Sequence, residues 1–457
     1  MIFVIILVVS MVAILGIARW VTWVLVNIEN KYDNAGRILD LKDLASKNEV
    51  ASALFRLVSE DGAGLWPPRA AHNRLPSCFQ PYQDIYLELI PNLSTAIPAL
   101  DDDINKQRIE EFRHKMSRLL CERVNILEVK HVLERFKLEG SRSLTQEIYN
   151  AVYCCVAVCR HAYRWGTIPV VKQAQNEIML DFPMELNVPW SYLQRHFELS
   201  GESGNMTSNI LLNFDQCGKR FYKVNITDSY KIATAEDIFS RIFFNIEVLA
   251  FPIYYEIALA TTAFADQRKK GCIRHVKNIA KQIKKLLPIF FDNLRDSKIA
   301  HAVWLSHVQG FQAWGVGRIV NGKFEKHDGL SGNQLLFFST IDAFLDLDRY
   351  LSDENMERYI PVNQRRLSLA IKNHSFRHKL DDGDVELKKY FKNIANYMRM
   401  FRSAHRSRAR PYLEHPAPER LIMTAGKSVL ETPKTKGFDD AYKPLDDMLM
   451  AQLQLTV

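Results

Sequence analysis

The chain has 457 residues, 47% hydrophobic and 25% charged, so it can bury a large core and is too long for one small domain. The formal net charge of +8 is modest for this length and is not typical of a nucleic-acid-binding protein. The seven cysteines are odd in number and include no Cys-x-x-Cys pair, which argues against a disulfide framework or a structural zinc site. We therefore expect buried thiols, including Cys155 and Cys159 in an apolar run.

The N-terminal segment is apolar. Residues 1–18 carry no charge, and apolar residues continue after Arg19. A helix of about 20 apolar residues spans a bilayer, so we predict a transmembrane anchor over residues 1–27. Because Lys31 and Arg37 follow the anchor and no basic residue precedes it, the positive-inside rule places the rest of the chain in the cytosol. A cleaved signal peptide is the alternative, although its usual charged first region is missing.

Helical patterns follow one another after the anchor. Residues 29–66 are predicted to form a helical approach segment. Three aspartates at 101–103 precede a helical pattern with one apolar face, and residues 145–165 are apolar on nearly every side, as in a central helix. Pro189 suits the first turn of another helix. Further helices are predicted over residues 234–263, with a kink at Pro252, and over 274–294, 334–348, 364–372 and 385–408.

These patterns predict an all-α protein, because no segment shows sustained period-two alternation of apolar and polar residues. We expect a smaller N-terminal helical domain at residues 28–180. It would pack on a larger C-terminal domain at residues 181–416, and residues 417–457 would form a tail that is partly disordered or draped over the surface.

A possible metal-binding group lies near the C-terminus. Arg402 and His405 lie one turn apart on a predicted helix, and a Gly/Ser loop with Ser331 and Gly332 precedes Asp342. A neutral imidazole can hold the iron of a porphyrin, and its second ring nitrogen then needs an acceptor, for which Asp342 is a candidate directly or through water. Arg402 would either neutralise a haem propionate or hold Asp342. From spacing alone, a solvated or phospholipid-binding basic face is the stronger explanation.

Sequence blocks elsewhere in the chain favour the haem site over the basic face. Short blocks recur between about residue 150 and residue 416: His161–Gly166, Phe182–Trp190, Trp314 and Gly322, Ser331, Gln334 and Asp342, Arg358–Pro361 with Arg365, and Arg402–His405 followed by Tyr412 and Pro416. In order and spacing they resemble the indoleamine 2,3-dioxygenase family of haem proteins. The Phe-Arg-x-x-His form is also similar to the monodechloroaminopyrrolnitrin synthase branch of that superfamily.

The resemblance implies a function. It makes His405 the proximal haem ligand and the only metal ligand from the protein, and it places Arg402, Asp342, Ser331 and Gly332 around the haem. The implied activity is a haem-dependent dioxygenase that adds O₂ across the C2–C3 bond of an indole or a related, tryptophan-derived aromatic. Haem, O₂, a small aromatic substrate and, through the anchor, a membrane are the expected partners, and nucleic acid is not.

The sequence departs from the family on the distal side of the haem. The arginine that pairs with the substrate carboxylate in the family is matched by Val308, and a shift of one residue would bring His307 to that place. The family's small distal serine is matched by Pro252, and its aromatic wall falls near Val248. Without the guanidinium–carboxylate contact, a free amino acid is disfavoured as the substrate.

Two other functions therefore stay open. One is a haem-dependent oxygenase or rearrangement enzyme of specialised metabolism, similar to the pyrrolnitrin synthase branch and acting on a modified tryptophan or an alkaloid. The other is a non-catalytic haem sensor or carrier at a membrane.

Overall fold

The computed structural model describes residues 34–94, 101–167, 176–215 and 217–414, together with residues 99, 174, 443, 447, 450, 451, 453 and 454. The predicted anchor at residues 1–27 lies outside the described residues, and so does most of the predicted tail.

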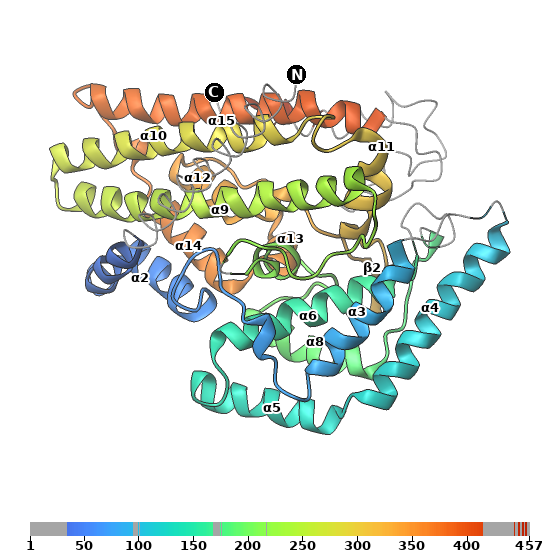
Figure 1. The fold of residues 1–457 in the computed structure, drawn as a ribbon. Helices are drawn as coiled ribbons and strands as arrows, with labels where there is room; N and C mark the ends of the chain where they lie inside the picture. The colour runs from blue at the N-terminus through green and yellow to red at the C-terminus, as the bar shows by residue number, and fades with distance from the viewer. Residues whose placement is uncertain are drawn as a thin grey trace, which may run out of the picture.

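The described chain is mostly helical, which confirms the predicted class (Figure 1). Its helices are α2 (Glu49–Arg56), α3 (Gln80–Ser94), α4 (Asp102–Arg123), α5 (Ile126–Glu139), α6 (Gln146–Trp165), α8 (Met184–Phe197), α9 (Tyr230–Ala265), α10 (Lys269–Asn293), α11 (His301–Val303), α12 (Leu336–Phe344), α13 (Asp353–Tyr359), α14 (Val362–Asn373) and α15 (Val385–Glu414). The backbone is also helical over residues 34–44.

One antiparallel hairpin departs from the expectation of a chain without strands. It consists of β1 (Gly317–Val320) and β2 (Lys323–Lys326), joined by Asn321 and Gly322, which both have positive φ. Asn-Gly is the preferred pair for a two-residue hairpin turn, so the turn carried a sequence signal for a hairpin. The strands carried no such signal, because each has four residues and neither shows alternating burial.

Two local predictions are confirmed by capping and burial. The carboxylate of Asp101 accepts a hydrogen bond from the backbone N–H of Asp103 at 2.9 Å and so begins α4. Helix α6 is buried on every side from Tyr149 onward, and it ends at Gly166, whose φ of 62° favours glycine. Cys155 and Cys159 are buried in α6, as expected.

Helix α8 begins earlier than predicted. It starts at Met184, so Pro189 lies inside the helix and not in its first turn. Proline has no N–H to donate to the carbonyl four residues before it, which belongs to Glu185. That carbonyl instead accepts a hydrogen bond from the hydroxyl of Tyr82 at 2.6 Å. A contact from a distant helix therefore satisfies the group that the proline leaves unpaired.

The helices pack around two hydrophobic cores. The first core unites α3, α4, α5, α6 and α8, and the second unites α2, α9, α10, α12, α14 and α15. This division differs from the predicted boundary at residue 180, because α2 packs on α9 and α14 while α8 packs on α5 and α6. In Figure 1, α15, α10 and α9 lie as nearly parallel rods above the α3–α8 group.

Among the described helices, one is long and apolar enough to cross a bilayer, namely α9. Its residues Ile246, Ala250, Ile253 and Ile257 are completely buried in the second core. Half of its apolar window is buried inside the protein, so packing in the second core accounts for part of the apolar character of α9.

Candidate functional site

His405 lies in an aromatic environment on α15. Its ring centroid is 5.5 Å from that of Phe290 on α10 and 6.3 Å from that of Phe401, with which it is nearly parallel. The imidazole forms no hydrogen bond with any described residue. Burial lowers the pKa of His405 from 6.5 to about 4. The ring is therefore neutral at pH 7, the form in which a histidine binds a metal.

Arg402 holds Asp342. The Nη2 of Arg402, on α15, donates to both carboxylate oxygens of Asp342, on α12, at 2.7 Å each. The two side chains are 10% and 5% exposed, so this is a buried ion pair. Burial raises the pKa of Asp342, and the charge of Arg402 opposes that shift. Two roles are predicted for Arg402, neutralising a haem propionate or holding Asp342. The structure shows the contact with Asp342. A direct bond from Asp342 to His405 is not formed, because both of its oxygens face the guanidinium.

Two further groups of aromatic side chains lie on the elements around α15, and we call them together the aromatic rim: Phe239 and Phe243 of α9, Trp304 of η6 (Trp304–Gln309), Phe338 of α12, and Phe401 and Tyr412 of α15. Of these, Phe401 contacts His405 directly. Phe239 contacts Phe243 at 5.0 Å and Trp304 at 6.4 Å between ring centroids, and Trp304 contacts Tyr412 at 5.2 Å. On the other side, Phe338 contacts Phe401 at 5.1 Å.

Helical spacing places Phe239 and Phe243 on the same side of α9 as the buried Ile246 and Ala250. Both phenylalanines nevertheless remain partly exposed. Partly exposed aromatic side chains on an inward face are suited to contact a bound apolar group.

The predicted Gly/Ser loop lies against the rim. A Cβ atom at Gly332 would be 3.2 Å from the ring of Phe243, so this glycine permits a close approach. The Ser331 hydroxyl accepts a hydrogen bond from the N–H of Asn333 at 3.4 Å and begins the short helix η8 (Gly332–Gln334). Gln334 fixes the loop, since its side chain accepts from the N–H of Met206 and donates to a carbonyl within the loop.

His307 and Val308 lie on η6, the π-helix that also carries Trp304. Val308 is buried in the second core. The Nδ1 of His307 is 2.6 Å from the Ser306 hydroxyl, and its carbonyl accepts from the Nδ2 of Asn225 at 2.6 Å. Burial lowers the pKa of His307. The η6 segment thus brings two predicted distal residues to an element of the rim, and π-helical turns are frequent at functional sites.

Val248 and Pro252 are not brought there. They lie four residues apart on one face of α9, and helical spacing puts that face opposite the one that carries Phe239 and Phe243. The sequence spacing did not single out Phe239 and Phe243. Their spacing of four, in register with Ile246 and Ala250, was the signal that could have found them.

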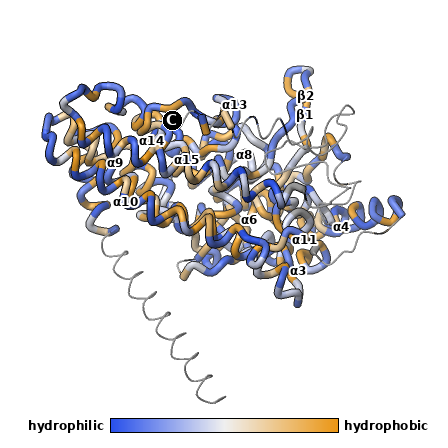
Figure 2. The backbone as a smooth tube through the Cα atoms, turned by 90° about the horizontal axis from the view of Figure 1, so that it is seen from above, coloured by the Kyte–Doolittle hydropathy of each residue, from blue (hydrophilic) through white to orange (hydrophobic). Residues whose placement is uncertain are grey.

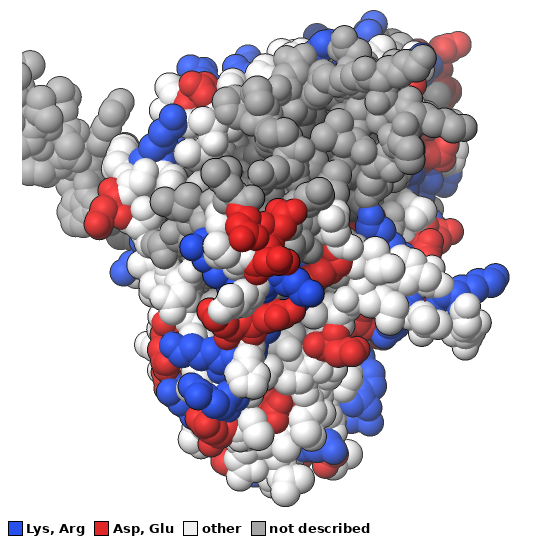
Figure 3. Space-filling model, turned by 90° about the vertical axis from the view of Figure 1, so that its right-hand side faces the viewer, with Lys and Arg blue, Asp and Glu red and all other residues white. Residues whose placement is uncertain are grey.

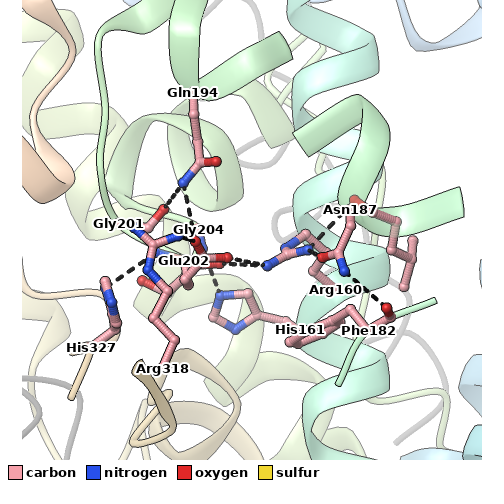
Figure 4. Close-up of polar contacts among 12 residues, drawn as sticks. Arg160, His161, Phe182, Asn187, Gln194, Gly201, Glu202, Gly204, Arg318 and His327 are labelled. Carbon is pink, nitrogen blue, oxygen red and sulfur yellow. Dashed lines mark hydrogen bonds and ion pairs between the residues drawn. The ribbon is translucent and has the colours of Figure 1, made fainter. Parts of the chain in front are cut away.

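A second polar cluster gathers other residues of the resemblance (Figure 4). Arg160 of α6 is completely buried, donates to Glu202 at 2.8 Å, and lies 4.2 Å from the ring centroid of Phe182 and 4.9 Å from that of Trp190. Arg318 of β1 reaches the other oxygen of Glu202 at 2.6 Å. This cluster joins α6, α8 and the hairpin.

His161 belongs to the same cluster, and both of its ring nitrogens are used. Its Nδ1 is 2.9 Å from the Phe311 carbonyl, and its Nε2 accepts from the N–H of Gly204 at 3.1 Å. Burial lowers its pKa to about 4, so the ring is neutral. Nδ1 is then the donor and Nε2 the acceptor, and no lone pair is left for a metal.

Within the described ranges, no three His, Cys, Asp or Glu side chains are grouped so that they could hold a metal ion. A haem bound through one histidine does not require such a group. No protein-family model matches the sequence, and a search of the curated proteins finds no match.

Proposed function

We propose that this protein is a haem-dependent dioxygenase that acts on an indole or a related aromatic compound. The observation that carries the proposal is the state of His405, a neutral imidazole with no hydrogen bond to a described residue, set among aromatic side chains. The fully buried His161 uses both ring nitrogens in hydrogen bonds, whereas the half-buried His405 uses neither within the described chain. An imidazole left free in apolar surroundings is suited to bind iron.

The donor chemistry of the site fits a haem. His405 would hold the iron, and the aromatic rim offers flat apolar surfaces of the kind that a porphyrin or an indole contacts. A bound ferrous haem supplies the activation of O₂ for addition to the substrate, which is chemistry that protein side chains do not provide.

The other residues position and shield the site. The buried pair of Arg402 and Asp342 ties α15 to α12 and so fixes the helix that carries His405. With Asp342 committed to Arg402, the imidazole Nδ1 or Nε2 that does not bind iron would have to use another acceptor. The rim supplies apolar surface beside the site, and Gly332 lets the loop pack directly on the ring of Phe243.

One observation favours the second candidate, an oxygenase or rearrangement enzyme for a substrate without a free carboxylate. Val308, at the position where the resembling family has its carboxylate-binding arginine, is buried in the core. An apolar side chain there cannot pair with a carboxylate, so indoles that lack one are better suited to the site.

The proposal is tested on the full chain, purified in detergent and supplied with haem. We expect the wild type to show the ferrous and CO-bound absorption of a histidine-ligated haem, and His405→Ala to lose it. The matched control is His374→Ala, because His374 is 43% exposed and pairs with Glu49 on the surface. The haem hypothesis is wrong if the wild type binds no haem, or if His405→Ala and His374→Ala bind it equally.

Product analysis then separates the functions. Ring-opened product from tryptophan or from a carboxylate-free indole, with O₂ consumed, supports the dioxygenase. A different oxidised product from the carboxylate-free compounds supports the second candidate. Tight haem binding without turnover of any indole supports the non-catalytic haem protein.

A further inference from the structure

Helix α10 carries a basic face. Between Lys269 and Phe291 it contains no Asp or Glu, and its apolar residues face the second core. The exposed Lys and Arg of α10 and of the neighbouring α15 form what we call the basic face: Lys270, Arg274, Lys277, Lys281, Lys284 and Lys285 on α10, and Lys389, Lys392 and Arg399 on α15. On α10 these residues recur three or four apart and therefore share one side of the helix.

The two helices present this charge together. Helix α15 packs along α10, and the Nζ of Lys277 lies 5.9 Å from the ring centroid of Tyr390 on α15. In the view of Figure 2, α10 and α15 run side by side, and hydrophilic positions recur along both.

The positive charge of this face is not neutralised within the described chain. None of the residues of the basic face forms an ion pair with a described residue. The neighbouring Lys269 of α10 and Lys388 of α15 do form ion pairs, with Asp384 at 2.7 Å and with Asp382 at 2.9 Å, and they are not part of the basic face. On the face of the molecule shown in Figure 3, basic and acidic side chains are interspersed. An ordinary solvated surface is mixed in sign. The run of basic residues on α10, which no Asp or Glu interrupts between Lys269 and Phe291, therefore requires an explanation. On α15 the charge is mixed, because Glu386 is exposed near Lys389.

We propose that the basic face rests on an anionic membrane surface. Clustered Lys and Arg beside a membrane segment are attracted to acidic lipid headgroups of the cytoplasmic leaflet, where the sequence places this chain. The predicted anchor precedes residues 34–44, and in that segment Arg37 lies over the ring of Tyr255 on α9 while Asp40 accepts from the Tyr255 hydroxyl at 2.8 Å. The start of the described chain is thus held on α9, the helix against which α10 packs.

The test uses the full chain in vesicles of phosphatidylcholine alone or with phosphatidylserine added. Lysines are acetylated with a water-soluble reagent, and the rate at each site is read by mass spectrometry. We expect Lys277, Lys281 and Lys284 to react severalfold more slowly in the anionic vesicles, with the difference removed by high salt. Exposed Lys130 and Lys137 of α5 serve as internal controls and should react equally in both.

A pair of variants checks that the charge itself is responsible. Lys281→Gln, Lys284→Gln and Lys285→Gln together should abolish the protection of Lys389 and Lys392 in anionic vesicles. The matched control combines Lys106→Gln, Lys130→Gln and Lys137→Gln and should retain it. Equal acetylation of the basic face in both vesicles, equal slowing of the α5 lysines, or protection by a DNA duplex but not by anionic vesicles would each overturn the proposal. None of these readouts depends on haem or on turnover.

Discussion

His161 and His405 differ in their surroundings, since His161 is buried and His405 is half-buried. Burial lowers the pKa of both to about 4, so both rings are neutral at pH 7. His161 gives both nitrogens to the backbone of distant segments, whereas His405 has only aromatic neighbours. A shifted pKa therefore does not by itself distinguish a structural histidine from a ligand. Hydrogen-bond partners separate His161 from His405, but the exposed His196 shares with His405 both the lowered pKa and a set of aromatic neighbours.

Each histidine is accompanied by a buried arginine, and these also differ. Arg160 has a carboxylate, an amide and three aromatic rings around it, and the cluster joins α6 to α8 and the hairpin. Arg402 has Asp342, which joins α15 to α12. The first arginine should matter for folding, and the second for folding and for haem binding.

The largest expected effect is that of Arg160→Met. The substitution keeps part of the side chain but breaks a buried ion pair and should lower the free energy of unfolding by about 3–5 kcal/mol. Urea unfolding of the full chain measures it. Arg318→Met is the control, because Arg318 bonds to the same Glu202 but is 48% exposed, and it should cost less than about 1 kcal/mol. If both variants lose the same free energy of unfolding, the burial of Arg160 does not contribute to stability.

Asp342→Asn should lower the free energy of unfolding less than Arg160→Met does, but it should also weaken haem binding. It leaves Arg402 buried without a counter-charge, which should cost about 3 kcal/mol. Because Arg402 is one turn from His405, we expect weaker haem binding in titrations followed by absorption. The control is Asp346→Asn, since Asp346 forms a half-exposed pair with Lys372 and has a positive φ that asparagine tolerates. If both variants bind haem as the wild type does, the pair does not position His405.

In the haem-free protein, His161 and His405 should each make the free energy of unfolding fall as the pH is lowered. Because their folded pKa values lie below 6.5, the unfolded chain binds more protons between about pH 6.5 and pH 4. Their contribution to stability is complete above pH 6.5 and is lost as the pH falls towards 4. Either His161→Gln or His405→Gln should make this decline shallower in urea unfolding at stepped pH. Added haem should alter the slope only where His405 is present. A change in slope with haem in His405→Gln would contradict the proposed ligand.

Gly332→Ala should have the smallest effect. The new Cβ would approach the Phe243 ring to 3.2 Å, so the ring must move by a few tenths of an ångström, and we expect a loss of less than about 1 kcal/mol in stability. Binding of an indole to the haem-loaded protein, followed by the shift in its absorption band, should weaken more clearly. Gly36→Ala is the control, because a Cβ atom at Gly36 has no neighbour within 4 Å. Unchanged indole binding would place the substrate away from Phe243.

The sequence predicted the features that depend on neighbouring residues. The cap at Asp101, the all-round burial of the helix ending at Trp165 and most of the helical segments follow from local spacing and composition. The early start of α8 was missed because the group that Pro189 leaves unpaired is satisfied by Tyr82, about a hundred positions away in the chain. The β1–β2 hairpin was missed because its strands are short and their burial does not alternate.

In the candidate site, the sequence by itself determined that Arg402 and His405 share a helix and that Asp342 is available to one of them. Only the tertiary structure decided that Asp342 faces Arg402, that His405 is left without a hydrogen bond, and that Phe239 and Phe243, not Val248 and Pro252, face inward. The physical reason is that helical period and capping act over a few residues. The choice of partner for a buried side chain depends on which helices pack together, and that is settled by the burial of two whole cores.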